Sequence, residues 1–504
     1  MEILAKPFPL AARSAVFTIA AALAIVLAPI WLSSALPAND LASHVYNAMV
    51  ADHVRAGEQP FASRFELRRF PRSAFATDAV LGITGPVVGW ETAERIWLSV
   101  IVGAGMLAYY SLLRNKMSPA WACAVSAWMA NNWYAWEGFC DFAIASIVFA
   151  VFAAVLRDSR GRFPWLRVVV CLSLLYATHL FLFAVAAALL GGMLIWRAKH
   201  GQSRWIALAA VAPPLALLIR ELTGPASQGR VHWTGLVGLS KAIAGTFVGD
   251  AVITFSWVSV LAGSVMMALV WSGLIQRNRN GRSFWQRDPM EIFAVAAFVG
   301  SWIVPDEIGA GSYTASRLRF AGVLALLPVM GDFRWPARRW VRFAPAALLL
   351  ALAAQEAKVV RLGSVEALHN TQIEQALLAA GVKPGSWVSA RLPTERSYVF
   401  RMQAFHYLAV PSYLRLGLCD LDDYEPRFGN FEVQWKRRPD QLASVERPSG
   451  IELSLQRGDA GWDGGLWLLH DSGQTVASED PTLSIGPTTV EGPYSVTRIT
   501  LAGR

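Results

Sequence analysis

Long apolar runs alternate with short polar gaps over roughly the first 355 residues, and this pattern predicts a polytopic α-helical membrane protein. The runs cover residues 15–36, 93–113, 118–135, 138–156, 166–196, 205–220, 251–275, 290–304, 318–331 and 342–354. The run at 166–196 is expected to form two short tilted helices that turn near Thr178 and His179, with a re-entrant hairpin as the alternative. The pattern therefore predicts about 11 transmembrane helices.

The polar gaps alternate in charge, which predicts the orientation of the chain. Arginine and lysine fill the gaps near 114–116, 157–167, 197–204, 277–287 and 334–342, and Lys6 and Arg13 precede the first run. The positive-inside rule puts these basic gaps in the cytoplasm. The gaps at 37–92, 131–137, 221–250 and 305–317 are mixed or acidic, so we expect them outside, with the N-terminus in the cytoplasm and the C-terminus outside.

Two apolar pieces of the N-terminal region need separate interpretation. The first run is about 20 residues long, which exceeds the core of a signal peptide and predicts a retained signal anchor. The piece from Asp78 to Trp90 is interrupted by Gly82, Gly85 and Pro86. Because it is too short to span a bilayer, we expect it to re-enter the membrane or to lie at its surface.

From about Gln355 the composition changes to that of a soluble domain. Residues 366–380 have helical spacing before Gly381, and residues 386–391, 451–456, 466–470 and 494–501 alternate like strands. We therefore predict a transmembrane domain at 1–355 with an outer loop at 37–92, and a small extracytoplasmic α/β or α+β domain at 356–504.

Composition narrows the class of protein. The chain has 54% hydrophobic and 16% charged residues, too apolar to be globular throughout. The net charge of +9 could suggest a protein that binds nucleic acid. The basic residues of this chain, however, lie between apolar runs, so they indicate its orientation in the membrane and predict no nucleic-acid partner. Four cysteines predict no disulfide within the tail, because only Cys419 lies there, and no metal-binding CxxC pattern exists.

The polar stretch after the first run contains the first candidate for chemistry. Asp40 and His44 are four residues apart and share one face of a helix that Gly57 and Pro60 are expected to end. A capped, solvated helix with Asp40 near its positive end is the simpler interpretation. Asp40 is alternatively a functional carboxylate with His44 as its neighbour.

Other polar residues gather at the predicted outer ends of the spans. Ionisable groups at the edge of a membrane are costly, so as a group they favour a substrate site, whereas each alone could be an interfacial anchor. These candidates are Asp78, Glu137, Asp141, His179, His232, Asp306, Glu307, Arg317 and Arg319.

Each of these candidates also has a structural interpretation. Arg317 and Arg319 could extend their charges from a helix end, but arginine is also suited to bidentate phosphate recognition. Glu137 and Asp141 could line the helix bundle, although paired carboxylates also serve acid–base or metal chemistry. His179 and His232 could be hydrogen-bonded core or interface residues.

The order of elements resembles the GT-C superfamily of membrane glycosyltransferases. The resemblance covers most of the chain and includes the strings Asn39-Asp40-Leu-Ala-Ser-His44, Gly57-x-x-Pro60, Pro71 to Asp78, Gly138-Phe-Cys-Asp-Phe142, Thr178-His179-Leu-Phe and Arg317-Leu-Arg-Phe320. It implies a sugar donor linked to a polyprenyl phosphate, an envelope glycan, lipid or protein acceptor, and a bacterial cytoplasmic membrane location. It also maps the catalytic carboxylate of the family onto Asp40.

This resemblance implies roles for the candidate residues. Asp40, assisted by His44, would take a proton from the acceptor, and Arg317, Arg319 and His179 would stabilise the departing phosphate. Asn39 stands where many members have a second acidic residue, so no metal and no other cofactor is predicted. A transporter or flippase of lipid-linked solutes and a non-catalytic subunit for envelope polysaccharide assembly are the alternative functions.

Overall fold

The computed structural model divides the chain into two compact units. The structure describes residues 10–68, 75–158, 164–198, 216, 219, 231–233, 235–278, 289–308, 313–332, 343–392, 402, 407–423, 426, 432–447, 450–462 and 465–502. Unit 1 comprises Met1–Leu32 and Leu98–Val359, and unit 2 comprises Ser33–Trp97 and Val360–Arg504. Helices α5 (Trp90–Leu113) and α16 (Ala344–Ala379) contribute residues to both units.

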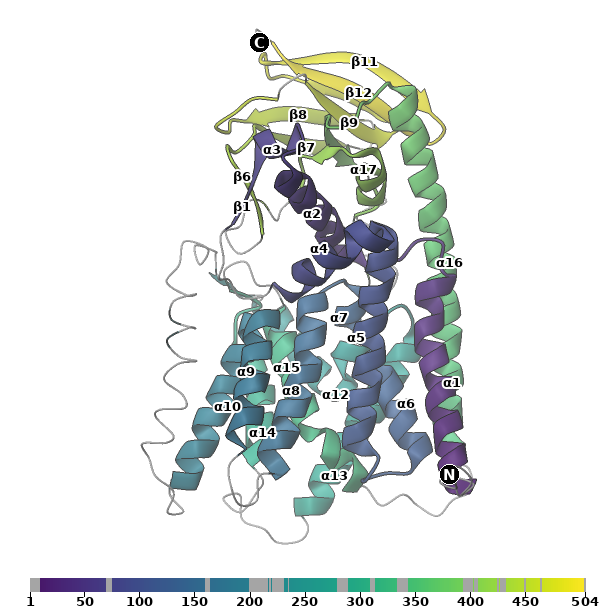
Figure 1. The fold of residues 1–504 in the computed structure, drawn as a ribbon, viewed down its shortest axis with the longest axis vertical. Coiled ribbons are helices and arrows are strands. Elements are labelled where there is room, and N and C mark those ends of the chain that lie inside the picture. Colours follow the sequence, from purple (N-terminus) through teal and green to yellow (C-terminus); the bar gives the residue numbers. More distant parts are fainter. Residues whose placement is uncertain are drawn as a thin grey trace, which may run out of the picture. The chain divides into compact units, whose positions relative to one another are not determined.

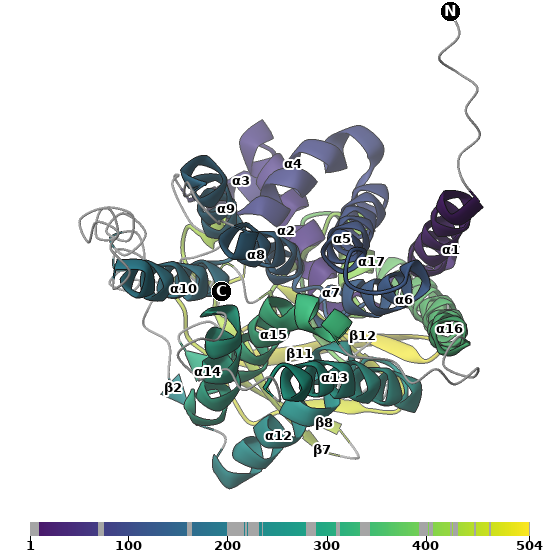
Figure 2. The same cartoon turned by 90° about the horizontal axis from the view of Figure 1, so that it is seen from below.

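Unit 1 is a bundle of apolar helices, which Figure 2 shows nearly end-on. Besides parts of α5 and α16 it contains α1 (Leu10–Leu32), α6 (Pro119–Ala130), α7 (Trp133–Trp136), α8 (Cys140–Asp158), α9 (Trp165–Thr178), α10 (Leu180–Ala198), α12 (Gly235–Val248), α13 (Trp257–Asn278), α14 (Pro289–Ile303) and α15 (Thr314–Leu326). It also contains the 3₁₀ helices η2 (Asp250–Val252) and η4 (Leu327–Asp332) and the strands β2 (Val231–His232) and β3 (Glu307–Ile308), which pair antiparallel.

Glycines allow two close approaches in this bundle. A Cβ atom on Gly263 of α13 would lie 2.3 Å from the carbonyl oxygen of Val248, and one on Gly273 would lie 2.3 Å from that of Val329. Both distances are far below van der Waals contact, so only glycine lets α13 pack at its observed distance from α12 and η4.

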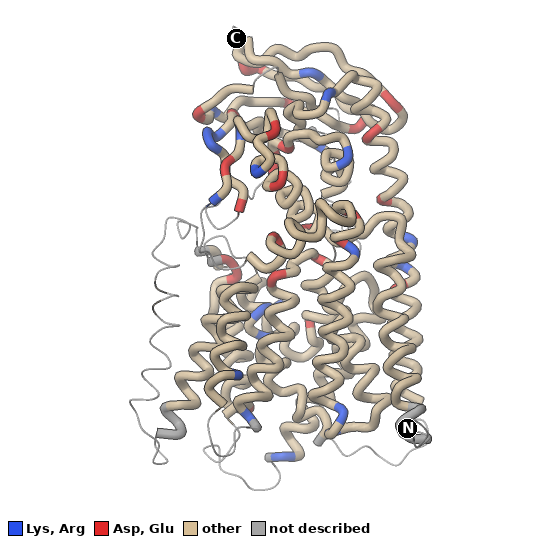
Figure 3. The backbone as a smooth tube through the Cα atoms, viewed as in Figure 1, with Lys and Arg blue, Asp and Glu red and all other residues tan. Residues whose placement is uncertain are grey.

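The membrane character of unit 1 follows from its long apolar helices. Among the described residues, four helices are long and apolar enough to cross a membrane: Ala15–Leu32, Trp90–Leu113, Cys140–Arg157 and Trp257–Arg277. Shorter apolar helices lie at Ala76–Val88, Trp165–Thr178, Leu180–Leu194, Gly235–Val248 and Pro289–Ile303. The chain is thus a multi-pass membrane protein, although the predicted count of about 11 spans is not confirmed. In Figure 3, blue stretches mark the lower ends of several of these helices, whose middles are largely uncharged.

The run at 166–196 forms two helices as predicted. Helix α9 ends at Thr178, His179 adopts an extended conformation with φ of −160°, and α10 begins at Leu180. The gap at 221–250, in contrast, was expected to be an outer loop but contains α12. The Gly and Lys residues of this segment interrupt its apolar pattern, so the sequence alone did not predict a helix there. The predicted run at 205–220 lies almost wholly outside the described residues.

Unit 2 combines short helices with β-sheets (Figure 1). Besides parts of α5 and α16, its helices are α2 (Asn39–Ala56), α3 (Phe61–Arg64), α4 (Ala76–Val88) and α17 (Val410–Leu416). Its strands are β1 (Phe65–Leu67), β4 (Trp387–Arg391), β5 (Cys419–Asp420), β6 (Val433–Trp435), β7 (Gln441–Arg447), β8 (Gly450–Gln456), β9 (Leu466–Asp471), β10 (Thr475–Ser478), β11 (Leu483–Glu491) and β12 (Tyr494–Leu501).

The sheets of unit 2 are mixed. The largest has the order β11-β12-β9-β4-β5, in which β4 is parallel to both neighbours and β12 is antiparallel to both of its own. A three-stranded sheet has the order β10-β8-β7, and β1 pairs with β6. All four predicted strands are present, as β4, β8, β9 and β12. The described C-terminal region is thus small and sheet-rich.

The boundary between the two units on the C-terminal side falls at Val359 and Val360, within helix α16. Helix α16 is continuous from Ala344 to Ala379, because its sequence has no residue that breaks a helix near Gln355. Residues 33–97, which we expected to be an outer loop of the transmembrane domain, form one compact unit with residues 360–504. Within it, the piece from Asp78 to Trp90 belongs mainly to α4, where Thr77 and Asp78 are buried.

Candidate functional site

Helix α2 carries Asp40 and His44 and is held firmly within unit 2. It ends as predicted at Gly57, whose φ of 73° places it in the left-handed region that glycine favours. The buried Tyr46 hydroxyl donates to the carbonyl oxygen of Leu418 at 3.0 Å and accepts from the backbone N–H of Asp420 at 2.7 Å. Tyr46 therefore fixes the helix against strand β5.

Asp40, His44 and Asp78 form one buried cluster between α2 and α4. His44 Nε2 lies 3.7 Å from Asp40 Oδ2, and His44 Nδ1 lies 3.5 Å from Asp78 Oδ1. The three residues are only 9%, 7% and 6% exposed, respectively. The structure thus brings together the two aspartates and the histidine that we predicted as candidates between residues 37 and 92.

This arrangement suits proton transfer. A protonated imidazole has an N–H on each side and can face both carboxylates, whereas a neutral one can donate to only one of them. His44 can therefore hold one carboxylate in place while the other accepts a proton. Burial strengthens these electrostatic interactions because it removes competing water.

In unit 1, Arg317 and His179 lie side by side. Arg317 Nη1 donates to His179 Nε2 at 3.3 Å, which requires the proton of a neutral His179 to be on Nδ1. The guanidinium carbon of Arg317 lies 5.1 Å and 5.2 Å from the ring centres of Phe139 and Phe142. Cation–π contacts with these two rings keep a buried positive charge in one orientation.

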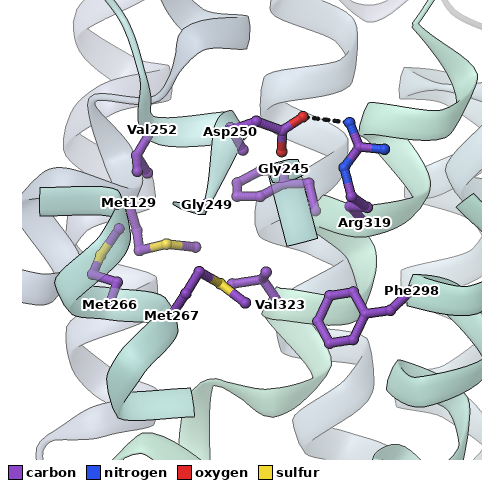
Figure 4. Close-up of a pocket in the computed structure, with 13 residues that line it drawn as sticks. Met129, Gly245, Gly249, Asp250, Val252, Met266, Met267, Phe298, Arg319 and Val323 are labelled. Carbon is purple, nitrogen blue, oxygen red and sulfur yellow. Dashed lines mark hydrogen bonds and ion pairs between the residues drawn. The ribbon is translucent and has the colours of Figure 1, made fainter. Parts of the chain in front are cut away.

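Arg319, two residues further along α15, has a different neighbour. It forms an ion pair with Asp250 of η2, and Asp250 also accepts from the Ser316 hydroxyl at 3.1 Å. Figure 4 shows this pair on the wall of a pocket that is otherwise lined by methionine, valine, alanine, phenylalanine and glycine. Gly245 lies against the pair, since a Cβ atom there would be 3.0 Å from both Arg319 Nε and Asp250 Cγ.

The two arginines therefore occupy different environments. Residues two apart on a helix point to nearly opposite sides, so Arg317 and Arg319 cannot approach one phosphate from the same face of α15. Asp250 was absent from our predicted site. Its only sequence signal was an isolated acidic residue between two apolar segments, which is costly unless it is paired.

Three other predicted site residues lie on or beside further elements of unit 1. Glu137 is 4% exposed and follows α7, while Asp141 lies in the first turn of α8. The His232 side chain is exposed, but its carbonyl oxygen accepts from the Asp306 N–H at 3.1 Å. Burial raises the pKa of Asp306, and the positive charge of Arg319 only partly opposes that effect.

The candidate site contains no obvious metal position in the part of the chain that the structure describes. No group of three or more His, Cys, Asp or Glu side chains there is arranged to hold a metal ion.

The chain shares its fold with a protein of known structure. ArnT from Cupriavidus metallidurans in the apo state aligns with a TM-score of 0.53 and 12% identity, covering 97% of this chain and 98% of that one. ArnT from the same organism bound to undecaprenyl phosphate aligns with a TM-score of 0.46 and 11% identity, at the same coverage. No protein-family model and no curated protein matches the sequence. The likeness to apo ArnT confirms the GT-C-like fold that the order of elements predicted.

Proposed function

We propose that this protein is a membrane glycosyltransferase of the GT-C type, which transfers a sugar from a polyprenyl-phosphate-linked donor to an envelope glycan, lipid or protein. The observation that carries the proposal is the buried cluster of Asp40, His44 and Asp78 in a chain with a GT-C-like fold. Burying two carboxylates beside an imidazole costs folding free energy, and such clusters concentrate at sites that transfer protons.

In the proposed reaction, the acceptor hydroxyl attacks the anomeric carbon of the donor sugar. A new carbon–oxygen bond forms, the bond from that carbon to the phosphate oxygen breaks, and the hydroxyl proton passes to Asp40. His44 lies 3.7 Å from Asp40 and 3.5 Å from Asp78, so a protonated His44 would orient Asp40 by electrostatic attraction while Asp78 balances the opposite side of the ring.

The polyprenyl phosphate that leaves gains negative charge, which a buried cation stabilises. Arg317 is the best candidate for this role, with His179 as its hydrogen-bonded neighbour. Arg319 makes a smaller contribution because Asp250 already neutralises its charge. Glu137, Asp141 and His232 remain proposed contacts with the sugar or its carrier.

The proposed location is the bacterial cytoplasmic membrane, which the chain crosses about 11 times by the apolar runs of its sequence. The basic gaps support a cytoplasmic N-terminus, and they leave residues 356–504 on the outer side. The mature C-terminal domain would then meet the acceptor outside the cytoplasm.

The test measures sugar transfer by the full chain in native membranes, using a panel of radiolabelled polyprenyl-phosphate sugars. We expect Asp40→Asn to lower the rate about 100- to 10,000-fold, which is the usual contribution of general acid–base catalysis. Asp52→Asn, on the same helix, is the matched control and should keep the rate.

Two results would reject the proposal. One is an unchanged transfer rate for Asp40→Asn in protein that is present at wild-type levels. The other is uptake of the intact lipid-linked sugar into vesicles without bond cleavage, which would identify a transporter or flippase. A chain that neither cleaves nor moves the donor would instead be an assembly subunit.

A further inference from the structure

A polar pocket lies within unit 2, on a part of α2 that includes neither Asp40 nor His44 in its lining. Its walls come from residues 34–36, Ala42 and Val45 of α2, the first turns of α5, the second half of α16, and α17. We call it the Glu366 pocket, and its polar lining comprises Ser34, Glu91, Glu94, Arg95, Glu366, Asn370 and Arg415.

Two polar side chains of α16 have unused hydrogen-bonding capacity in this pocket. Asn370 is 0% exposed, and neither its Oδ1 nor its Nδ2 has a hydrogen-bond partner among the described residues. Glu366, one turn earlier on the same face, is 5% exposed, and its Oε2 also has no hydrogen-bond partner within the described part of the chain. A buried amide without any partner is costly, which points to a ligand that satisfies it.

The charges in the Glu366 pocket favour a cation. Its three carboxylates and two guanidinium groups give a formal net charge of −1. Arg415 is already engaged, because its Nε and Nη1 each donate at 2.5 Å, to Glu91 and to Glu374 outside the pocket. Arg95 donates to the Ser34 carbonyl oxygen at 3.1 Å.

Glu366 also lacks sufficient compensation for its own charge. Burial raises the pKa of Glu366 well above its usual range, and the nearby Glu94 carboxylate raises it further against the attraction of Arg415. The raised pKa favours the protonated form of Glu366 in the empty pocket, and binding of a positive ligand would favour its charged form.

The backbone around the pocket is closely fitted. The Ala35 N–H donates to the Gly363 carbonyl oxygen at 3.2 Å, and a Cβ atom on Gly363 would lie 2.2 Å from the Ala35 oxygen. Gly363 thus allows residues 34–36 to lie directly against α16. Ala35 also belongs to the lining of the pocket.

We propose that the Glu366 pocket binds a primary ammonium group that has an oxygen atom nearby, as in ethanolamine. An ammonium has three N–H donors, which match acceptors on Glu366, Glu94 and Asn370, while Asn370 Nδ2 donates to the adjacent oxygen. This site is additional to the proposed glycosyltransferase activity and does not depend on it.

Two sources could supply this chemistry. Ser34 follows closely on the candidate span Ala15–Leu32, and Glu91 lies in the first turn of the candidate span Trp90–Leu113. These chain positions put the pocket residues near the membrane surface, where the ethanolamine headgroup of a phospholipid lies. A free amino alcohol is the other source.

The test uses native mass spectrometry of the full chain in detergent with phosphatidylethanolamine, and phosphatidylcholine as the lipid without ammonium N–H donors. Wild-type protein should bind phosphatidylethanolamine at least about tenfold more tightly, and Glu366→Gln and Asn370→Leu should each remove most of this preference. Gln375→Leu, at an exposed position on the same helix outside the pocket, should keep it. Glu366→Asp, which retains the charge, should keep part of it.

Competition with free ethanolamine distinguishes the sources. Displacement of the lipid by ethanolamine at millimolar concentration supports a site for the free amine as well, and no displacement supports a headgroup site. Equal binding of the two lipids would overturn the proposal, and so would an unchanged preference in both Glu366→Gln and Asn370→Leu. Binding of calcium or magnesium alone that Glu366→Gln abolishes, without a lipid preference, would overturn it in favour of a metal site.

Discussion

The ion pair between Arg319 and Asp250 allows a sharp test of how unit 1 is stabilised. Asp250→Asn keeps the size of the side chain but removes the negative charge beside Arg319. The two side chains are only 7% and 14% exposed, so little water can replace the lost partner. The Ser316 hydroxyl can still donate to the new amide oxygen, which confines the change mainly to the charge.

The expected cost follows from the burial of the pair. Removing one member of a buried ion pair destabilises a protein by about 3–5 kcal/mol, because the other charge is left without compensation. Because Asp250 keeps a small exposure to solvent, we expect the free energy of unfolding to fall by about 3 kcal/mol, the lower end of this range. The double variant Asp250→Leu and Arg319→Met removes both charges, so it should recover most of the lost stability.

The cysteines provide the assay. All four are free and buried, so a thiol-reactive fluorescent dye reports thermal unfolding of the full chain in detergent. We expect Asp250→Asn to lower the unfolding temperature by about 5 °C or more. An unchanged temperature would show that the pair does not stabilise unit 1. A double variant as unstable as the single one would show that packing, and not charge, accounts for the loss.

Three further predictions concern packing and pH. Tyr46→Phe should lower the free energy of unfolding by about 1–3 kcal/mol, because it leaves the Leu418 carbonyl and the Asp420 N–H without their partner, and denaturant titration measures this loss. Gly263→Ala should cost about 1–3 kcal/mol or more through its clash with the Val248 oxygen. Gly192→Ala, inside helix α10 with nothing within 4 Å of the new Cβ atom, should keep or slightly raise the unfolding temperature, because alanine is the better helix former. Burial lowers the pKa of His470, so the folded state favours the neutral imidazole and the free energy of unfolding should fall as the pH drops below about 6.5. A plot of this free energy against pH should be less steep for His470→Gln than for the wild type. Equal slopes would contradict the reasoning.

Local patterns in the sequence predicted the elements that depend on nearby residues. Gly57 ends α2 as expected, and the two helices at 166–196 separate at His179. The strands β4, β8, β9 and β12 follow alternating patterns that remain visible without any tertiary information. Such features depend only on hydrophobic periodicity and on residues that end a helix or strand. Both can be recognised in a short segment of sequence.

Features that depend on distant residues could not be predicted in this way. Helix α16 continues through the composition change near Gln355, because a change in solvent exposure does not require a break in the helix. The pairing of Asp250 with Arg319 joins two residues far apart in the chain, and neither had a local signal for the other. Asn370 was likewise invisible, since only its complete burial makes its unused amide informative.

The interpretation of Asp40 illustrates how burial separates two hypotheses that share one sequence pattern. A capping role required Asp40 to be solvated near the start of a helix, and its four-residue spacing from His44 was compatible with that role. In the structure the N-cap position is Ala38, without a side-chain capping bond, and Asp40 is 9% exposed beside His44. Asp78 then supplies a second carboxylate from a separate helix, which a simple cap does not need. The cost of burying this cluster is better explained by proton transfer than by the stability of α2, and the Asp40→Asn transfer rate distinguishes these two explanations.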